Sequence, residues 1–189
     1  MMKGWTKAYI FFKKFNLTFA KIKKTLENPI IEIKKIKKEK QFEYFTLLLI
    51  AIYWIAAFYR YNHIPDTIPI HYSIDGSIDN YGSKIFIFIF PFLATLIYFL
   101  LLFATKNPHK FHYNVTITEE NAERQYRNAL QMIRALNFSI VLSFFIIDAP
   151  ILFTKDGFSK DLNGFLFILI GILPIFTIAY YMSKSYKIN

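Results

Sequence analysis

The stretch between residues 60 and 84 holds the side chains best suited to chemistry. His71, Asp75 and Asp79 follow one another at intervals of four residues, and His63 precedes them. Imidazole nitrogens combined with carboxylate oxygens form a donor set that suits zinc or manganese. The spacing matches no named metal motif, so a second interpretation stays open, in which His71 and Asp79 bond to loop backbone and hold a turn.

The same stretch predicts the elements that position these side chains. Apolar residues alternate with other residues from Ile68 to Asp75, and a period of two indicates a short strand. Asp75 and Gly76 form a favourable turn dipeptide, because glycine adopts positive φ without steric cost. We expect the apolar face to lie toward the protein or the membrane surface, with His71, Ser73 and Asp75 together on the other face.

Asp148 is the second candidate, because it is an acid within an apolar stretch. An ionised carboxylate at the middle of a bilayer costs at least ~2.5 kcal/mol, so such residues usually have a partner. The sequence offers Arg60, Lys84, Lys155 or the His71 loop as that partner. The alternative is a position at a helix end, among the lipid headgroups.

Enzyme motifs are missing from the sequence. It contains no cysteine, no glycine-rich phosphate loop, no serine nucleophile elbow and no His-Glu-x-x-His pair. We therefore expect a non-enzymatic protein without a cofactor.

The composition predicts a membrane protein. Of 189 residues, 54% are hydrophobic and 19% are charged, whereas a soluble domain carries about 25% charged residues. The chain also contains 22 Phe and 13 Tyr. A small soluble domain buries only about 70% of its surface, which leaves too little core for so many aromatic rings.

Four stretches are long and apolar enough to span a bilayer, which requires about 20 residues. They are residues 42–59, 85–105, 135–153 and 164–182. Each must be helical in lipid, because unpaired backbone groups are costly there. The sequence thus predicts an all-α membrane protein with four transmembrane helices. Interfacial anchors are expected at Tyr53, Trp54, Tyr59 and Tyr61 near one end of the first span, and at Tyr180 and Tyr181 near the end of the fourth.

The chain divides into four regions on this interpretation. They are a basic arm (1–41), a first helix pair with an outer motif loop at 60–84 (42–105), a cytoplasmic loop and helix (106–134), and a second helix pair with a short tail (135–189). Lys and Arg then number 19 on the side of the N-terminus and 4 on the other side. This bias predicts that both termini are cytoplasmic.

The arm carries most of the net charge of +10. Residues 1–40 hold twelve Lys and three Glu. From Trp5 to Leu26, aromatic and aliphatic residues fall on one helical face, with lysines on the opposite face. This pattern predicts an amphipathic helix among anionic lipid headgroups that ends at Asn28-Pro29. A partly disordered tail is the alternative. No known nucleic-acid motif accompanies the lysines, so we expect no nucleic-acid partner.

The sequence of the cytoplasmic loop (106–134), which we call the inner loop, predicts a helix that continues into the third span. Thr118 is expected to cap its amino end, with Glu119 and Glu120 in the first turn, where negative charge is favoured. The helix then continues through Arg134. Its polar side chains either contact neighbouring inner loops or a partner, or are solvated; they are Asn121, Glu123, Arg124 and Tyr126.

Two segments resemble a known family. The outer segment carries Pro65, Asp66, Pro69, His71, Gly76, Asp79, Gly82 and Lys84, and the inner segment carries Asn121, Glu123, Arg124 and Tyr126. Together they resemble the domain of unknown function shared with SdpI-like bacterial membrane proteins, over about residues 45–150. The resemblance implies a non-enzymatic, multi-pass protein of the bacterial plasma membrane that gives immunity to, or senses, a membrane-active peptide.

Two other functions remain open from the sequence. One is a metal-dependent site around His71, either hydrolytic or sensory. The other is a small transporter subunit, for which Asp148 is the evidence. The expected partners are a bilayer with anionic lipids, together with a peptide toxin or a membrane protein. Self-association is left open.

Overall fold

A computed structural model describes residues 28–73, 77–153 and 164–188 of the chain. The elements within these ranges are α2 (Lys37–Tyr61), β1 (Thr67–Tyr72), β2 (Ile78–Ser83), the 3-10 helix η1 (Lys84–Phe88), α3 (Ile89–Ala104), the 3-10 helix η2 (Pro108–Lys110), α4 (Ala122–Phe153) and α5 (Gly164–Lys187). The helix predicted on the arm before Asn28, and the turn at Asp75-Gly76, lie outside the described residues.

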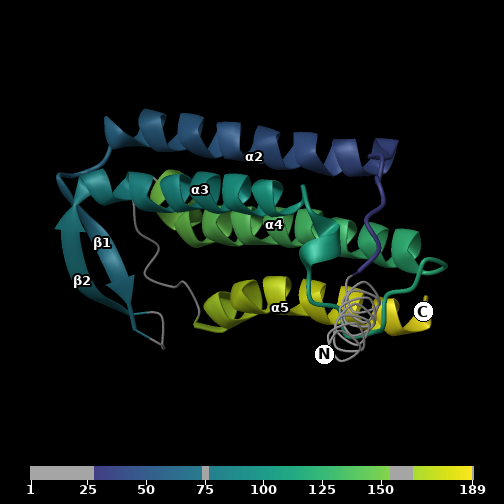
Figure 1. The fold of residues 1–189 in the computed structure, drawn as a ribbon. Coiled ribbons are helices and arrows are strands. Elements are labelled where there is room, and N and C mark those ends of the chain that lie inside the picture. Colours follow the sequence, from purple (N-terminus) through teal and green to yellow (C-terminus); the bar gives the residue numbers. More distant parts are fainter. Residues whose placement is uncertain (1–27, 74–76, 154–163, 189) are drawn as a thin grey trace, which may run out of the picture.

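Helix α4 is the centre of the bundle. Helices α2 and α3 lie against one side of it and α5 lies against another, as Figure 1 shows. Its 32 residues correspond to about 48 Å, well beyond the ~30 Å of a hydrocarbon core. The predicted continuation from the inner loop through Arg134 into the third span is therefore confirmed.

Three described helical segments are long and apolar enough to cross a membrane. They are Glu39–Tyr61, Lys84–Ala104 and Ala122–Phe153, and they contain the first three predicted spans, except that the second ends at Ala104 rather than Thr105. The fourth predicted span, 164–182, lies within α5, a helix of 24 residues that continues to Lys187. The side chains of residues 164–170 lie outside the described part, so the fourth crossing stays a prediction.

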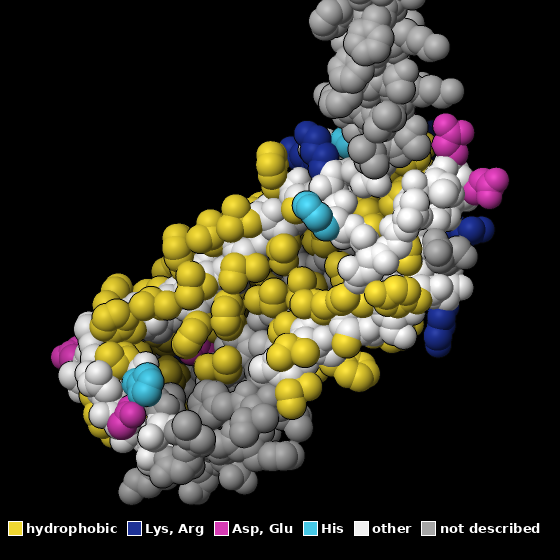
Figure 2. All heavy atoms as spheres, turned by 60° about the horizontal axis from the view of Figure 1, so that its bottom comes forward, with side chains coloured by type: hydrophobic (Ala, Val, Ile, Leu, Met, Phe, Trp, Pro, Cys, Tyr) yellow, Lys and Arg dark blue, Asp and Glu magenta, His cyan; other side chains and the backbone are white. Residues whose placement is uncertain are grey.

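The surface is apolar where a bilayer would contact it. Figure 2 shows hydrophobic side chains across the middle of one face, with charged side chains gathered toward the two ends. Large side chains such as Phe45, Ile55 and Phe99 are more than half exposed. Such residues are favourable in lipid and unfavourable in water. Helix length and hydropathy together identify a multi-pass membrane protein.

A small β-hairpin lies at one end of the bundle. Strands β1 and β2 pair antiparallel, with Thr67 opposite Ser83 and Ile68 opposite Gly82. The start of α2 and the end of α5 lie at the opposite end (Figure 1). The predicted strand, which was expected to run from Ile68 to Asp75, is confirmed from Ile68 to Tyr72 as part of β1. The sequence did not predict β2, because Ile78–Ser83 lacks an alternating apolar pattern.

The core forms where α2, α3 and α4 meet the base of the hairpin. Small residues at Ala57 and Ala94 are fully buried and allow close approach of the helices. Tyr53 is also fully buried, so the expectation that it anchors the helix at an interface is wrong. Trp54 is half-buried and its indole N–H donates to the Thr95 hydroxyl at 3.0 Å.

Candidate functional site

The hairpin is closed at its base by residues of the outer motif. The Lys84 ammonium lies 2.9 Å from an Asp66 carboxylate oxygen, and the Lys84 backbone N–H donates to the Asp66 carbonyl at 2.8 Å. The same ammonium lies 5.0 Å from the centre of the Tyr61 ring, within reach of a cation–π interaction. Asp66 and Lys84 therefore join the start of the hairpin to its end and to α2.

Gly82 lies at a closely packed position inside the hairpin. A Cβ atom at this position would lie 2.8 Å from Ile70 Cδ1 and 3.1 Å from Phe86 Cδ2. Real Cβ atoms essentially never come as close as the first distance. The motif glycine thus allows β2 to lie directly against Ile70.

We expect Gly82→Ala to destabilise the protein by about 1 kcal/mol, the lower end of the ~1–3 kcal/mol typical of overpacking, because the partly exposed Ile70 can shift. Thermal unfolding of the purified full-length protein in detergent measures this effect. Gly171→Ala is the control for a methyl group added in open space, because no heavy atom outside its own helix backbone and chain neighbours lies within 4 Å of the added Cβ. It should not lower the melting temperature, since alanine is favoured over glycine within a helix. Equal melting temperatures for wild type and G82A would contradict the packing argument.

His71 and Asp79 form a pair on the exposed side of the hairpin. His71 Nδ1 lies 2.6 Å from Asp79 Oδ1, and both side chains are exposed. The contact joins β1 to β2 directly, whereas the structural interpretation of the sequence had each side chain bond to loop backbone. Asp75 lies outside the described residues, and the described residues contain no group of three potential metal ligands. His63 Nδ1 instead lies 2.7 Å from the Tyr59 carbonyl oxygen.

The hairpin also exposes apolar side chains. Tyr81 is 57% exposed and Ile70 is 39% exposed, close to the His71–Asp79 pair in the strand register. Ile85 and Phe86 of η1 continue this exposed surface toward α3. The hairpin thus combines a supported backbone with a surface that is both polar and aromatic.

Asp148 is buried in the bundle, with an exposure of 3%. The Tyr53 hydroxyl lies 2.5 Å from its Oδ2 atom and 3.0 Å from the Phe144 carbonyl oxygen. The sequence had suggested a cation, the His71 loop or the headgroup zone. The structure instead gives Asp148 a phenol as its hydrogen-bond donor. Arg60, one of the suggested cations, donates through Nε to the Ile151 carbonyl at 3.1 Å.

A group of charged side chains, which we call the inner ionic cluster, joins α2 to α4 at the end opposite the hairpin. Its members are Lys35, Glu39, Glu43, Arg127 and Arg134. Arg134 Nε donates to Glu43 at 2.9 Å, and the other Glu43 oxygen lies 2.8 Å from Lys35 Nζ. The Glu39 carboxylate, which is 2% exposed, lies 3.7 Å from Arg127 and 3.8 Å from Arg134.

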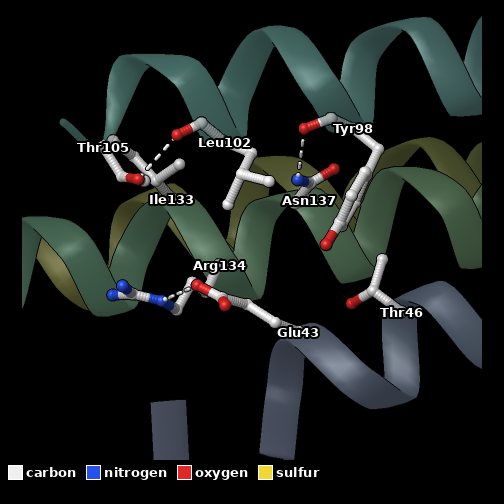
Figure 3. A pocket seen from close by; sticks show the side chains of 8 residues that line it. All are labelled: Glu43, Thr46, Tyr98, Leu102, Thr105, Ile133, Arg134 and Asn137. Atoms are coloured by element: carbon white, nitrogen blue, oxygen red, sulfur yellow. Dashed lines mark hydrogen bonds and ion pairs between the residues drawn. The ribbon is translucent and has the colours of Figure 1, made fainter. Parts of the chain in front are cut away.

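The inner ionic cluster borders a small polar pocket between α2, α3 and α4. Figure 3 shows Glu43, Thr46, Tyr98, Arg134 and Asn137 around it. The Asn137 amide donates to the Tyr98 carbonyl at 3.1 Å, and its side-chain oxygen is buried without a hydrogen bond among the described residues. The pocket is therefore a polar region within helices that are otherwise apolar.

The inner motif holds the inner loop against the bundle. The Tyr126 hydroxyl donates to the Pro29 carbonyl at 2.7 Å, and its ring lies 5.5 Å from that of Tyr113. Burial raises the pKa of the Tyr113 phenol well above its ordinary value, with a smaller contribution from Tyr126. Tyr113 therefore keeps its proton and donates to Pro108 at 2.8 Å. Of the roles expected for Tyr126, the structure shows contact with neighbouring segments of the chain, at Pro29 and Tyr113.

The amino end of α4 differs from the prediction. The helix begins at Ala122, so Glu119 and Glu120 lie in the preceding turn rather than in its first turn. Thr118 accepts from the Asn121 backbone N–H at 3.3 Å, and the Asn121 side chain accepts from the Thr118 N–H at 2.9 Å. Glu123 pairs with Arg127 at 3.0 Å, and Arg124 is exposed.

Comparison with known proteins concerns the part of the chain that contains the hairpin. Residues 48–95 match the family model described as Domain of unknown function (DUF1648). This DUF1648 segment extends from α2 through the hairpin into α3, and it contains both the Asp66–Lys84 contact and the His71–Asp79 pair. The domain of unknown function that the motifs suggested is thereby confirmed for this segment.

A distant relative extends the similarity beyond the DUF1648 segment. The chain is 25% identical over 148 residues to an uncharacterized protein of Archaeoglobus fulgidus, an alignment that covers 71% of this chain and 78% of the relative. No solved structure matches the chain. The link to SdpI-like proteins rests on the motifs alone.

Sequence reasoning did not select the residues of the inner ionic cluster or Tyr53 as parts of a site. Glu39 and Glu43 are four residues apart, and Arg127 and Arg134 are seven apart, so each pair shares one helical face. An acidic face on one helix and a basic face on another were therefore a signal in the sequence that the two helices could pair. Tyr53 and Asp148 are single residues on their helices, so no repeated spacing of charge indicated that their side chains meet.

Proposed function

We propose that this chain is a non-enzymatic integral membrane protein of the bacterial plasma membrane that protects against, or senses, a membrane-active peptide in the manner of SdpI-like proteins. In this proposal both termini are cytoplasmic and the hairpin of the DUF1648 segment is outside. The outer hairpin meets the incoming peptide, and the helix bundle carries the contact into the membrane.

The observation that carries the proposal is the exposed and internally supported hairpin. Asp66, Lys84 and Gly82 fix its backbone, so little conformational entropy is lost when a ligand binds. An aromatic side chain at Tyr81 adjoins the polar pair of His71 and Asp79. Aromatic residues contribute strongly to binding surfaces, and an extended or amphipathic peptide offers matching apolar and charged groups.

The distribution of charge supports the orientation. Lys34, Lys37, Lys106 and Lys110 are exposed at the end opposite the hairpin. Positively charged segments are retained on the cytoplasmic side of a membrane. This argument supports an extracytoplasmic hairpin, and it is independent of the family resemblance.

A binding experiment tests the proposal. We expect a synthetic cationic amphipathic peptide to bind nanodiscs that contain the full-length protein more tightly than empty nanodiscs. Tyr81→Ala should weaken that binding about tenfold, the equivalent of ~1.4 kcal/mol. Tyr186→Ala is the matched control, because Tyr186 is similarly exposed but lies near the end of α5. Equal binding to empty and loaded nanodiscs would refute the proposal.

A second candidate function, a small transporter subunit, is favoured by Asp148. An ionisable residue buried within a membrane-spanning helix often marks a path for ions or protons. If this function holds, Asp148→Asn should slow proton uptake by proteoliposomes loaded with a pH-sensitive dye. Identical uptake by wild type, D148N and protein-free liposomes would exclude proton transport.

A further inference from the structure

An apolar groove lies between α2 and α4 on the surface that faces lipid. Its volume is about 530 Å³, and its walls include Phe45, Leu48 and Ile52 of α2 with Phe138 and Leu142 of α4. Gln41 stands at the end nearest the start of α2. The groove is separate from the hairpin and from the polar pocket of Figure 3.

The length of the groove matches the depth of one leaflet. From Gln41 to Ile52 the helix advances eleven residues, which is about 17 Å at 1.5 Å per residue. Half of a typical hydrocarbon core is about 15 Å. A single acyl chain running parallel to α2 would therefore fill the groove along its length.

The mouth of the groove is positively charged. Lys37 lies one helical turn before Gln41, and Lys40 directly precedes it; both side chains are exposed. Within the described part of the chain, no acidic side chain pairs with either lysine, because Glu43 contacts Lys35 and Arg134 while Glu39 is buried beside Arg127. Lysines next to a membrane-spanning helix attract anionic headgroups, at roughly 1 kcal/mol each.

We propose that the α2–α4 groove is a specific site for an anionic phospholipid in the leaflet at this end of the bundle. One acyl chain lies against Leu48 and Phe138, and the phosphate group lies between Lys37 and Lys40. A second copy of the chain is a poorer occupant. Two copies in one membrane share an orientation, so a symmetric contact would bring their lysines together.

Native mass spectrometry of the full-length protein tests this site, with phosphatidylglycerol and phosphatidylcholine of identical acyl chains as probes. We expect the wild type to retain phosphatidylglycerol preferentially. Lys37→Gln with Lys40→Gln should weaken its retention about 30-fold, the equivalent of ~2 kcal/mol. Leu48→Trp, which fills the groove, should remove one bound molecule of either lipid.

Two matched controls separate the site from general attraction. Lys110→Gln with Lys187→Gln removes the same charge at the same end of the bundle, and Leu100→Trp adds the same bulk to an equally exposed position on α3. Both controls should retain phosphatidylglycerol as the wild type does. Equal retention of the two lipids by the wild type, or equal losses in test and control variants, would overturn the proposal.

The competing occupant gives a distinct result. If the protein is a dimer that Leu48→Trp dissociates, a second copy fills the groove and the lipid site is refuted. Leu48→Ala guards against a folding defect in L48W, because it widens the groove without adding bulk. L48A should keep the preference for phosphatidylglycerol, and loss of that preference while Lys37 and Lys40 are intact would also count against the site.

Discussion

Arg134→Met is expected to lower the free energy of unfolding by about 3–5 kcal/mol, the range measured when one partner of a buried ion pair is removed. The Arg134 side chain is 5% exposed and contacts both Glu43, at 2.9 Å, and Glu39, at 3.8 Å. Methionine fills a similar volume but leaves the carboxylate of Glu39 with Arg127 at 3.7 Å as its remaining cation. The cost arises from buried charge rather than from lost packing.

Unfolding of the purified full-length protein in mixed micelles, followed by circular dichroism, measures this loss. Arg124→Met is the matched control, because Arg124 is an exposed arginine on the same helix; it should unfold like the wild type. Adding Glu39→Gln and Glu43→Gln to R134M should recover much of the lost stability, since the unpaired charges are then gone. A small effect of R134M, or no recovery in the triple variant, would show that the inner ionic cluster is not the source of stability.

The inner ionic cluster also explains why α2 begins before the predicted span. The composition of residues 1–41 indicated a separate arm, yet α2 begins at Lys37, within that arm. Glu39 and Glu43 lie one helical turn apart and both contact α4. The ion pairs therefore fix the first turns of α2 against the bundle, where hydropathy alone predicted only a boundary near residue 42.

The apolar helices could be predicted because their signal is local. About 20 consecutive apolar residues determine a helix in lipid whatever lies elsewhere in the chain. The start of α4 was less predictable, because Thr118 and Asn121 cap each other in a turn before the helix. The sequence identified Thr118 as a capping residue, did not identify Asn121 as its partner, and placed the first helical turn too early.

Strand β1 of the hairpin was predictable because its signal, like that of the apolar helices, is local. Strand β1 shows alternation, whereas β2 depends on β1 for its pairing and contains Gly82, a residue disfavoured in strands. A shift in register between Pro69 and His71 further disturbs the simple alternation of faces. His71 and Asp79 were singled out by residue type, but their mutual contact required the paired strands.

Long-range partners inside the bundle could not be predicted from spacing. The sequence indicated that the Asp148 carboxylate has a high free-energy cost in lipid, and cationic side chains were the expected partners for it. Tyrosines near a span end are more often interfacial anchors, which is why Tyr53 was assigned that role. The position of Tyr53 is instead determined by the packing of α2 on α4, which brings its phenol to Asp148 in the interior of the bundle.

Tyr53→Ala is expected to cost about 3–5 kcal/mol, as for other buried aromatic residues that are truncated to alanine. Tyr53 has no exposed surface, and its ring lies edge-on to Phe145 with centres 5.3 Å apart. The truncation removes that packing and also leaves Asp148 without its hydrogen-bond donor. Thermal unfolding in detergent measures the sum of the two losses.

Tyr53→Phe separates the two losses, because it keeps the ring and removes only the hydroxyl. An unsatisfied buried acceptor costs about 1–3 kcal/mol, so Y53F should unfold between the wild type and Y53A. In Asp148→Leu, which has no carboxylate to satisfy, adding Tyr53→Phe should cost measurably less than it does in the wild type. Tyr59→Phe, at a 65% exposed position on the same helix, is the control and should change little. If Y53F is as stable as Y59F, the contact between Tyr53 and Asp148 does not hold α2 to α4, and the ring alone does.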